Sequence, residues 1–333
     1  MLGKKVAIDL GTQSLRLLVK GEGVITSEPS VVTTEGGVQG APGLYGVAAL
    51  GAAAESARVQ LRRPVAAGSV ADAAALRLLI NLLMARAVGR QRIFKPDVVL
   101  SVVAGMSGDD RRTILDVTMS AGARTVYLID AVMAGAIGAG VPVTSASGHL
   151  AVDIGAGKTD VAVLAMESTI AGRSLAGHGG DRLVAGVSAH VRDAHGIALD
   201  TVVAEDVVAS LLRTGPHEER RLTVTGRRDG ANPSVALTST EVSGVLDAYV
   251  RPIAAAIHDV LDETPEALLP DIHREGIVMF GGGARLEGLD RYLSGVTGIR
   301  VRIDRDPQIA VIRGAGYALD NLDVLKRNFM YIR

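Results

Sequence analysis

Hydrophobic residues in this chain occur in short runs that alternate with longer segments of mixed or small residues. In the first half, Val98–Val103 predicts a buried strand and Gly108–Ala121 a helix. A second strand is predicted at Thr125–Ile129, and a helix of small residues follows at Asp130–Ala139, before Gly140. Strands that alternate with helices in this way predict a three-layer α/β architecture.

The second half continues the alternation. A strand is predicted at Ile277–Phe280, and helices are predicted at Asp181–His195, Val202–Leu212 and Leu286–Val296. Thr238 with Glu241 predicts the cap of a further long helix that reaches about Asp262. Ser69 with Asp72 predicts a similar cap for a helix that begins near Ala71. The polar stretch 215–233 predicts an exposed loop or hairpin, whereas residues 33–62 show no clear pattern.

An internal repeat indicates how these elements are organised. The segment VAIDLGTQSLRLLV, Val6–Val19, aligns with AVDIGAGKTDVAVL, Ala151–Leu164. Asp9 then matches Asp153, and Gly11 matches Gly155. In both copies a strand ends in Asp, a tight Gly turn follows, and a second strand returns, which predicts two related domains that each open with a hairpin.

Length and composition narrow the class of protein. A chain of 333 residues with 48% hydrophobic residues can form about two domains. The formal net charge of −1 provides no general field for nucleic acid, so no nucleic-acid partner is expected. Without cysteines, no disulfide can form, and neither a signal peptide nor an uninterrupted membrane span is recognisable. A cytoplasmic location is the expectation.

Four glycine-rich turns follow predicted strands or hairpins and are candidates for anion binding. Glycine lets backbone N–H groups converge on a phosphate, and a helix N-terminus adds partial positive charge. None of the turns is a Walker A loop, and none is the GxGxxG turn of a Rossmann unit. The turns are DLGTQS at 9–14, DIGAGKT at 153–159, GHGGDR at 177–182 and FGGGARL at 280–286.

These motifs, in this order, resemble the actin, heat-shock chaperone and sugar-kinase superfamily, and within it the MreB/Mbl family of bacterial actins. The resemblance runs nearly end to end. It rests on DLGTQS, EPSVV (28–32), VYLIDA (126–131), AIGAGVPV (136–143), VDIGAGKTDVAV (152–163), GGDR (179–182), GGGARLEGLD (281–290) and GIRVRIDRDPQIAVIRGAG (298–316).

The resemblance implies a duplicated, ribonuclease-H-like α/β fold with a nucleotide cleft between two actin-like domains. We expect the first domain at residues 1–145, with a small inserted subdomain at about 33–65. The second is expected at 146–320, with a subdomain at about 180–255. The helix at 309–320 is expected to return to the first domain, and residues 321–333 form a tail.

The resemblance also implies which residues hold ATP or ADP. The two hairpins would bind the β- and γ-phosphates with Mg²⁺, which Asp9 and Asp153 would hold through water and the phosphates rather than directly. The GGGA turn would contact the α-phosphate and sugar, and a helix with an acid and a Lys would hold the adenosine. The matching positions are Asp9, Gly11, Thr12, Gln13, Ser14, Gly155, Ala156, Gly157, Lys158, Thr159, Gly179, Gly180, Asp181, Glu205, Val208, Gly281, Gly282, Gly283 and Ala284.

Three departures from the family pattern concern the chemistry. Where the family has Glu-Glu-Pro below the γ-phosphate, this chain has Asp130, Ala131 and Val132, so the acid that would orient the attacking water is shortened or missing. Where the family has GGGTTE, Lys158 replaces a hydroxyl residue. Where the adenosine helix carries ERIK, this chain ends the motif in Val208. Asp130 and Asp153 are the candidate catalytic groups, and the chain is at most a slow ATPase.

Two roles are open for Lys158. Its charge could neutralise the terminal phosphate in place of Mg²⁺, or its flexible stem could point to solvent from the turn. In the first case, nucleotide would be held without promoting attack by water.

A second surface is suggested where apolar and basic residues are mixed. Arg90, Arg92, Ile93, Phe94 and Lys95 lie at the junction of a helix and a strand, and such a mixture suits an anionic lipid face. The alternative is that Ile93 and Phe94 only cover the end of a sheet. The tail 325–333 has a similar composition, for which packing on its own domain is the alternative.

The sequence therefore predicts an MreB/Mbl-like cytoskeletal protein that binds ATP or ADP and has weak or lost hydrolysis. Through the resemblance, we expect filaments of self-associated chains, peripheral on the inner face of the cell membrane, that scaffold cell-wall synthesis and cell shape with morphogenesis or division proteins. An active filament-forming ATPase and a nucleotide-free actin-like adaptor are the alternatives.

Overall fold

The computed structural model describes residues 3–34, 43–89, 94–215, 218–320 and 331–332. Contacts divide the chain into two units, each built from several stretches of sequence. Unit 1 comprises Met1–Ala146, Ala165–Thr169 and Gln308–Arg333, and unit 2 comprises Ser147–Leu164 and Ile170–Pro307. The chain thus returns to unit 1 near its C-terminus.

Unit 1 is built on a six-stranded sheet whose order is β17-β9-β8-β1-β2-β3. Strand β1 (Lys5–Leu10) pairs in parallel with β8 (Asp97–Val102), which pairs in parallel with β9 (Thr125–Asp130). On its other side, β1 pairs antiparallel with β2 (Ser14–Val19), which pairs with β3 (Gly23–Pro29). The edge strand β17 (Tyr331–Ile332) joins β9 antiparallel, so the end of the tail lies on this unit's own sheet.

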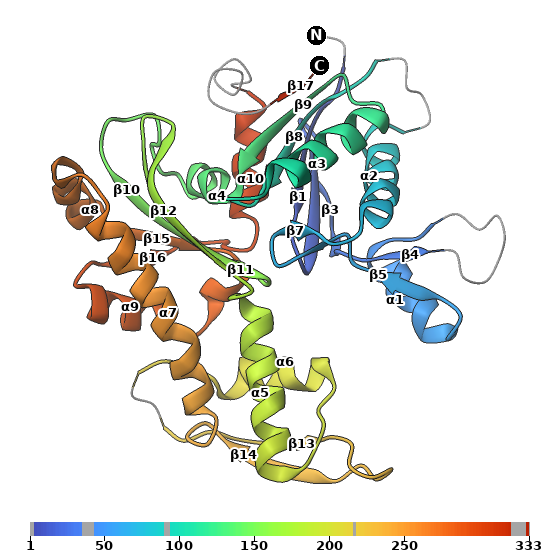
Figure 1. Cartoon of the computed structure of the whole chain (residues 1–333), viewed down its shortest axis with the longest axis vertical. Coiled ribbons are helices and arrows are strands. Elements are labelled where there is room, and N and C mark those ends of the chain that lie inside the picture. The colour runs from blue at the N-terminus through green and yellow to red at the C-terminus, as the bar shows by residue number, and fades with distance from the viewer. Residues whose placement is uncertain (1–2, 35–42, 90–93, 216–217, 321–330, 333) are drawn as a thin grey trace. The chain divides into compact units, whose positions relative to one another are not determined.

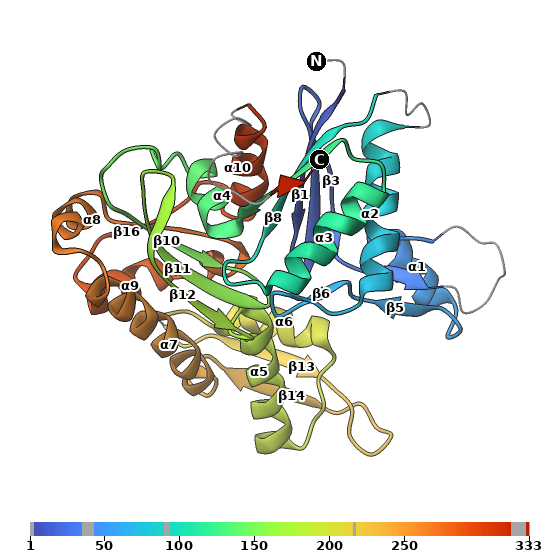
Figure 2. The same cartoon turned by 45° about the horizontal axis from the view of Figure 1, so that its top comes forward.

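Helices cover both faces of this sheet (Figures 1 and 2). On one face lie α2 (Ala73–Val88) and α3 (Gly108–Ser120), whose apolar residues form a core with those of β1, β2 and β8. On the other face lie α4 (Ala131–Gly138) and α10 (Ala310–Ala318). Burial on both faces explains the near-continuous apolar runs of β8 and β9.

The segment without a clear sequence pattern forms short elements beside β3. These are β4 (Val32–Thr34), α1 (Gly46–Glu55), β5 (Gln60–Arg62), β6 (Val65–Ala66) and β7 (Ser69–Val70). Strand β4 pairs with β5, and β6 pairs with β7.

Unit 2 is built on a five-stranded sheet whose order is β12-β11-β10-β15-β16. Strand β10 (His149–Ile154) pairs antiparallel with β11 (Lys158–Ala165), which lies next to β12 (Ser168–Ala176). Strand β10 also pairs in parallel with β15 (Ile277–Phe280), which pairs in parallel with β16 (Val301–Ile303). The order and directions match those of β2-β1-β8-β9, so the predicted internal repeat is confirmed.

The helices of unit 2 share one hydrophobic core with this sheet. They are α5 (Gly180–His195), α6 (Thr201–Leu211), α7 (Ser243–Asp262), α8 (Leu269–Glu275) and α9 (Leu289–Thr297), with 3₁₀ turns η1 (Glu266–Leu268) and η2 (Gly282–Arg285). The polar stretch forms a hairpin, as predicted, of β13 (Arg221–Thr225) and β14 (Ser234–Thr238). It contacts α6 through β13.

Three predicted helix starts are wrong. Helix α2 is capped by Asp72, whose carboxylate accepts hydrogen bonds from the N–H groups of Ala74 and Ala75, whereas Ser69 lies in β7. Thr238 does accept the N–H of Glu241, but a turn intervenes before α7 begins. Helix α9 begins only after Gly288, which has a positive φ that a helix cannot continue.

Helices α4 and α10 approach closely through facing glycines. A Cβ atom added at Gly314 would lie 1.7 Å from the carbonyl oxygen of Ala134, and one at Gly138 would lie 1.9 Å from that of Ala310. Arg313 adds a hydrogen bond of 2.7 Å from its Nε to the carbonyl oxygen of Gly138. Backbone lies on both sides of this contact, so no side-chain shift can make room for a methyl group.

We therefore expect Gly314→Ala to destabilise the protein by about 3 kcal/mol or more, because the two helices must separate. The free energy of unfolding, from denaturant titration, is the measurement. Gly51→Ala in α1 is the control, since nothing lies within 4 Å of its added Cβ and the substitution raises helix propensity by about 1 kcal/mol. Equal stability of the two variants would contradict the packing argument.

Candidate functional site

The two hairpins of the repeat have the same turn. In the first, the N–H of Gly11 donates to the carbonyl oxygen of Ser14 at 3.1 Å. In the second, the N–H of Gly155 donates to the carbonyl oxygen of Lys158 at 2.9 Å. These residues are at the equivalent positions of the repeat. A Cβ on Gly11 would lie 2.7 Å from the Ser14 oxygen, so this turn needs a glycine. Both turns follow a central strand of their sheet.

In unit 1, Asp9 lies near the end of β1 and is paired with Arg16 on β2. The two residues are register partners, and the distance from Arg16 Nη1 to Asp9 Oδ2 is 3.3 Å. Ser101, on β8, donates a hydrogen bond of 2.7 Å to the other carboxylate oxygen. Burial raises the pKa of Asp9, and Arg16 and Ser101 partly offset that rise.

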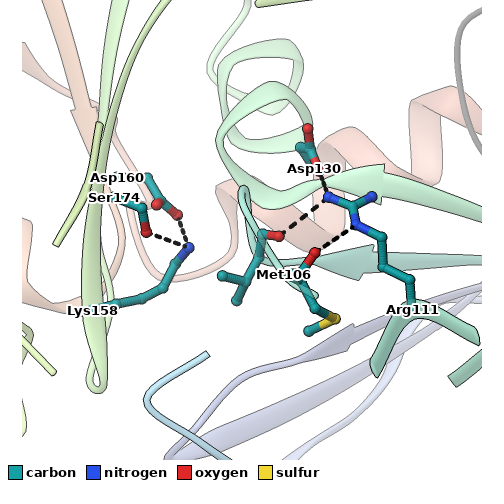
Figure 3. Close-up of polar contacts among 7 residues, drawn as sticks. Met106, Arg111, Asp130, Lys158, Asp160 and Ser174 are labelled. Atoms are coloured by element: carbon teal, nitrogen blue, oxygen red, sulfur yellow. Dashed lines mark hydrogen bonds and ion pairs between the residues drawn. The ribbon is translucent and has the colours of Figure 1, made fainter. Parts of the chain in front are cut away.

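Asp130 lies at the end of β9, two strands from Asp9 in the same sheet. Its Oδ1 atom accepts a hydrogen bond of 2.8 Å from Arg111 Nη2 on α3 (Figure 3). Arg111 is held in place by the carbonyl oxygens of Met106 and Val103. Although Asp130 is the N-cap residue of α4, its side chain makes no cap hydrogen bond, because the carboxylate pairs with Arg111 instead.

In unit 2, Lys158 is buried against its own strand. Its Nζ atom pairs with the carboxylate of Asp160 and lies 3.4 Å from Ser174 Oγ on β12 (Figure 3). The side chains of Lys158 and Asp160 are only 8% and 1% exposed. The interpretation in which Lys158 points to solvent is therefore wrong, and its charge is engaged within the hairpin.

Three of the four predicted turns meet at the end of the unit 2 hairpin. The N–H groups of Gly180 and Asp181, at the start of α5, donate to the carbonyl oxygens of Gly155 and Ala156. Gly179 is required there, since a Cβ would lie 2.3 Å from the Ala156 oxygen. The hydroxyl of Thr159 adds a hydrogen bond to the carbonyl oxygen of His178.

The GGGA turn reaches the same strand end from β15. Gly281 has a φ of +87°, and a Cβ on it would lie 2.5 Å from Asp153 Oδ1 and 2.4 Å from the carbonyl oxygen of Ile154. A Cβ on Gly283 would meet the Ile154 side chain at 2.2 Å. These glycines therefore let the turn lie directly against β10.

Helix α6 carries the predicted adenosine residues. Glu205 is exposed, whereas Val208 packs against the hydrophobic core of unit 2. Just after the helix, Arg213 makes two contacts with Glu287, with Nη1 at 3.2 Å and Nη2 at 3.1 Å from its carboxylate oxygens. Because Glu287 follows the GGGA turn, this bidentate pair ties α6 to that turn.

One further sequence interpretation concerns a possible membrane contact. Of the predicted membrane residues, Phe94 is 50% exposed and Lys95 is exposed, while Arg90, Arg92 and Ile93 lie outside the described residues. Among the helices that the structure describes, none is both long enough and apolar enough to span a membrane.

Two histidines of α5, His190 and His195, share one acidic partner. The Nε2 atoms of His190 and His195 lie 3.4 Å and 2.6 Å from the same oxygen of Glu241. This cluster ties the C-terminal half of α5 to the segment before α7, at the far end of the helix from the glycine turns.

A family model for MreB/Mbl protein matches residues 3–327 of the chain. The cell shape-determining protein MreB of Escherichia coli strain K12 is 34% identical over 335 residues, covering 97% of this chain and 95% of the relative. The chain belongs to the MreB/Mbl family. The cell shape-determining protein Mbl of Bacillus subtilis strain 168 is 29% identical, with 98% and 99% of the two chains covered.

Solved structures of this family and of related filaments confirm the actin-like fold. MreB5 of Spiroplasma citri bound to ADP has a TM-score of 0.89 and 26% identity, over 98% of this chain and 99% of that one. A MamK double helical filament has a TM-score of 0.81 at 19% identity, over 95% and 99%, which supports the fold alone. The chain is thus an actin-like protein of a family of cell shape determinants.

Sequence reasoning missed three arginines around the glycine turns. Arg16 could have been found as the residue opposite Asp9 in the predicted hairpin. Arg111 and Arg213 left no such signal, because each pairs with an acid from a distant segment.

The buried pair of Lys158 and Asp160 leads to a stability prediction. Lys158→Met would leave the Asp160 carboxylate without its ammonium partner and should destabilise the protein by about 3–5 kcal/mol. Adding Asp160→Leu should recover most of that loss, because an apolar pair can replace a buried ion pair at little cost. Denaturant unfolding is the measurement.

The matched control for Lys158→Met is Lys20→Met. Lys20 pairs with Asp320 on the surface, with side chains 45% and 50% exposed, so its loss should cost less than about 1 kcal/mol. A similar small loss for Lys158→Met would show that the buried pair does not matter for stability.

Proposed function

We propose that this chain binds ATP or ADP through the glycine turns of both units and forms filaments that act as a scaffold, with little or no hydrolysis. Support for binding comes from the duplicated hairpins, whose turns have the same hydrogen bond, and from the GGDR and GGGA turns that meet the second hairpin. The similar MreB5 of Spiroplasma citri has been solved with ADP and with AMPPNP. Asp9 through Ser14 and Gly155 through Thr159 would surround the phosphates.

Adenosine would lie between helix α6 and the GGGA turn of unit 2. Glu205 is exposed on α6 and can accept hydrogen bonds from a sugar, and Gly281 through Ala284 present backbone rather than side chains. Arg213 would fix the distance between the two elements through Glu287. Val208 contributes packing only, so we expect less polar recognition than an ERIK helix would provide.

The proposed loss of hydrolysis rests on the ion pair between Arg111 and Asp130. A general base must accept a proton from the attacking water, and here Asp130 Oδ1 already accepts a hydrogen bond of 2.8 Å from Arg111. Asp130 is also one methylene shorter than glutamate.

Filament formation fits the membership of this family and the likeness to a MamK filament in fold. In this proposal nucleotide favours the polymerising conformation by binding it more tightly than the other, so assembly needs no turnover. The filaments would lie on the inner face of the membrane, with exposed Phe94 beside Lys95 as a contact, and would organise cell-wall synthesis with morphogenesis proteins.

We expect calorimetry to show ATP binding by the wild type while phosphate release stays at background. Arg111→Gln should raise release by about tenfold or more, because it frees the Asp130 carboxylate as a base. Pelleting and electron microscopy on the same samples should show nucleotide-dependent filaments.

Arg112→Gln is the control, because Arg112 is the exposed neighbour of Arg111 on α3. Rapid release by the wild type would favour an active filament-forming ATPase. Filaments with no detectable nucleotide binding would favour a nucleotide-free adaptor.

A further inference from the structure

Three acids at or near the strand ends that carry these turns share a feature that the family pattern does not imply: Asp9, Asp130 and Asp160 are each paired with a cation from their own unit. In a metal-dependent phosphate site, Asp9 and Asp153 would face Mg²⁺ and its waters, and their negative charge would be balanced by the ion. Here Arg16 supplies positive charge to Asp9 itself, and Lys158 pairs with Asp160, the register partner of Asp153.

The first pair lies within the unit 1 hairpin. Asp9 and Arg16 are register partners, so their side chains lie on the same face of the sheet. Both side chains are mostly buried, at 14% and 12% exposure, and Ser101 occupies the second carboxylate oxygen. An ion that used this carboxylate would compete with the guanidinium of Arg16.

The second hairpin has two carboxylates and one ammonium. Asp153 and Asp160 are register partners across β10 and β11, so two like charges lie opposite each other. Lys158 is two residues from Asp160 on β11 and pairs with it. Lys158 therefore brings one positive charge to a hairpin that carries two carboxylates.

This arrangement is a poor fit for Mg²⁺. Mg²⁺ requires nearly octahedral oxygen ligands and keeps several of its waters, which occupy space in front of the carboxylates. The donor set here is Asp9 bonded to Arg16 and Ser101, and a second hairpin in which Lys158 adds positive charge.

We propose that this chain binds adenine nucleotide without a divalent metal ion, because Arg16 neutralises Asp9 and Lys158 adds a positive charge to the hairpin that carries Asp153 and Asp160. The inference rests on the proposed nucleotide binding and assigns a role to Arg16. Lys158 acts on Asp160 rather than on the terminal phosphate, and the backbone N–H groups of the turns contact the phosphates directly.

Binding of ADP and of ATP to the full chain should be measured by calorimetry in excess Mg²⁺ and again in EDTA. We expect the two dissociation constants for each nucleotide to agree within about threefold, a difference of less than 1 kcal/mol. Binding that is weaker in EDTA by more than about tenfold would overturn the inference while leaving the proposed function intact. No binding under either condition would overturn both.

Two variants test whether Arg16 makes nucleotide binding independent of a metal ion. Arg16→Met exposes the charge of Asp9, so nucleotide binding should become dependent on Mg²⁺, with the tenfold or larger loss in EDTA that the wild type lacks. Arg16→Met with Asp9→Asn removes both charges and should again bind equally well with and without metal. Metal-independent binding by the single variant would show that Arg16 does not act in this way.

A spectroscopic measurement on the wild type keeps the inference testable if Arg16→Met does not fold. The electron paramagnetic resonance signal of free Mn²⁺ reports uptake of the ion by a complex. With ADP and the protein together, we expect no more Mn²⁺ uptake than with ADP alone. Additional uptake that saturates with the protein–ADP complex would show a metal site and overturn the inference.

Discussion

The hydrogen bond that closes each hairpin turn is the constraint on which the proposed site depends. From Gly11 to Ser14 in unit 1, and from Gly155 to Lys158 in unit 2, it reverses the chain within a few residues of a buried aspartate. Each hairpin also contains a central strand of its sheet, since β1 and β10 pair in parallel with β8 and β15. The core therefore holds the turns and their carboxylates in place.

Carboxylates at these strand ends lose hydration when the chain folds, and basic side chains of the same unit balance their negative charge. Asp9, Asp130 and Asp160 each have a basic partner in the same unit. A buried pair costs desolvation of both ions, so such pairs contribute little net stability but become costly when one partner is lost. The same pairs remove the freedom that a general base or a metal ligand needs, which links these ion pairs to the proposed loss of hydrolysis.

Close approach between backbone segments at glycine positions is a second feature that occurs in both units. Gly179 and Gly281 let the GGDR and GGGA turns lie against the unit 2 hairpin, and Gly314 lets α10 lie against α4. In unit 1, that contact joins a helix near the C-terminus to the helix that begins after Asp130. The position of Asp130 thus depends on residues far away in the sequence, through packing that tolerates no added atom.

By itself, the sequence determined the α/β class, the internal repeat, most strands and helices, and the family, because these follow from local periodicity and from motifs in a fixed order. It did not determine the start of α2, because Ser69 and Asp72 are both acceptable caps and only the β6–β7 pairing excludes Ser69. The ion pairs of Asp130 with Arg111 and of Arg213 with Glu287 were decided only by the tertiary structure. Those residues are distant in sequence, and no periodicity records which side chain the folded chain brings within reach of a charge.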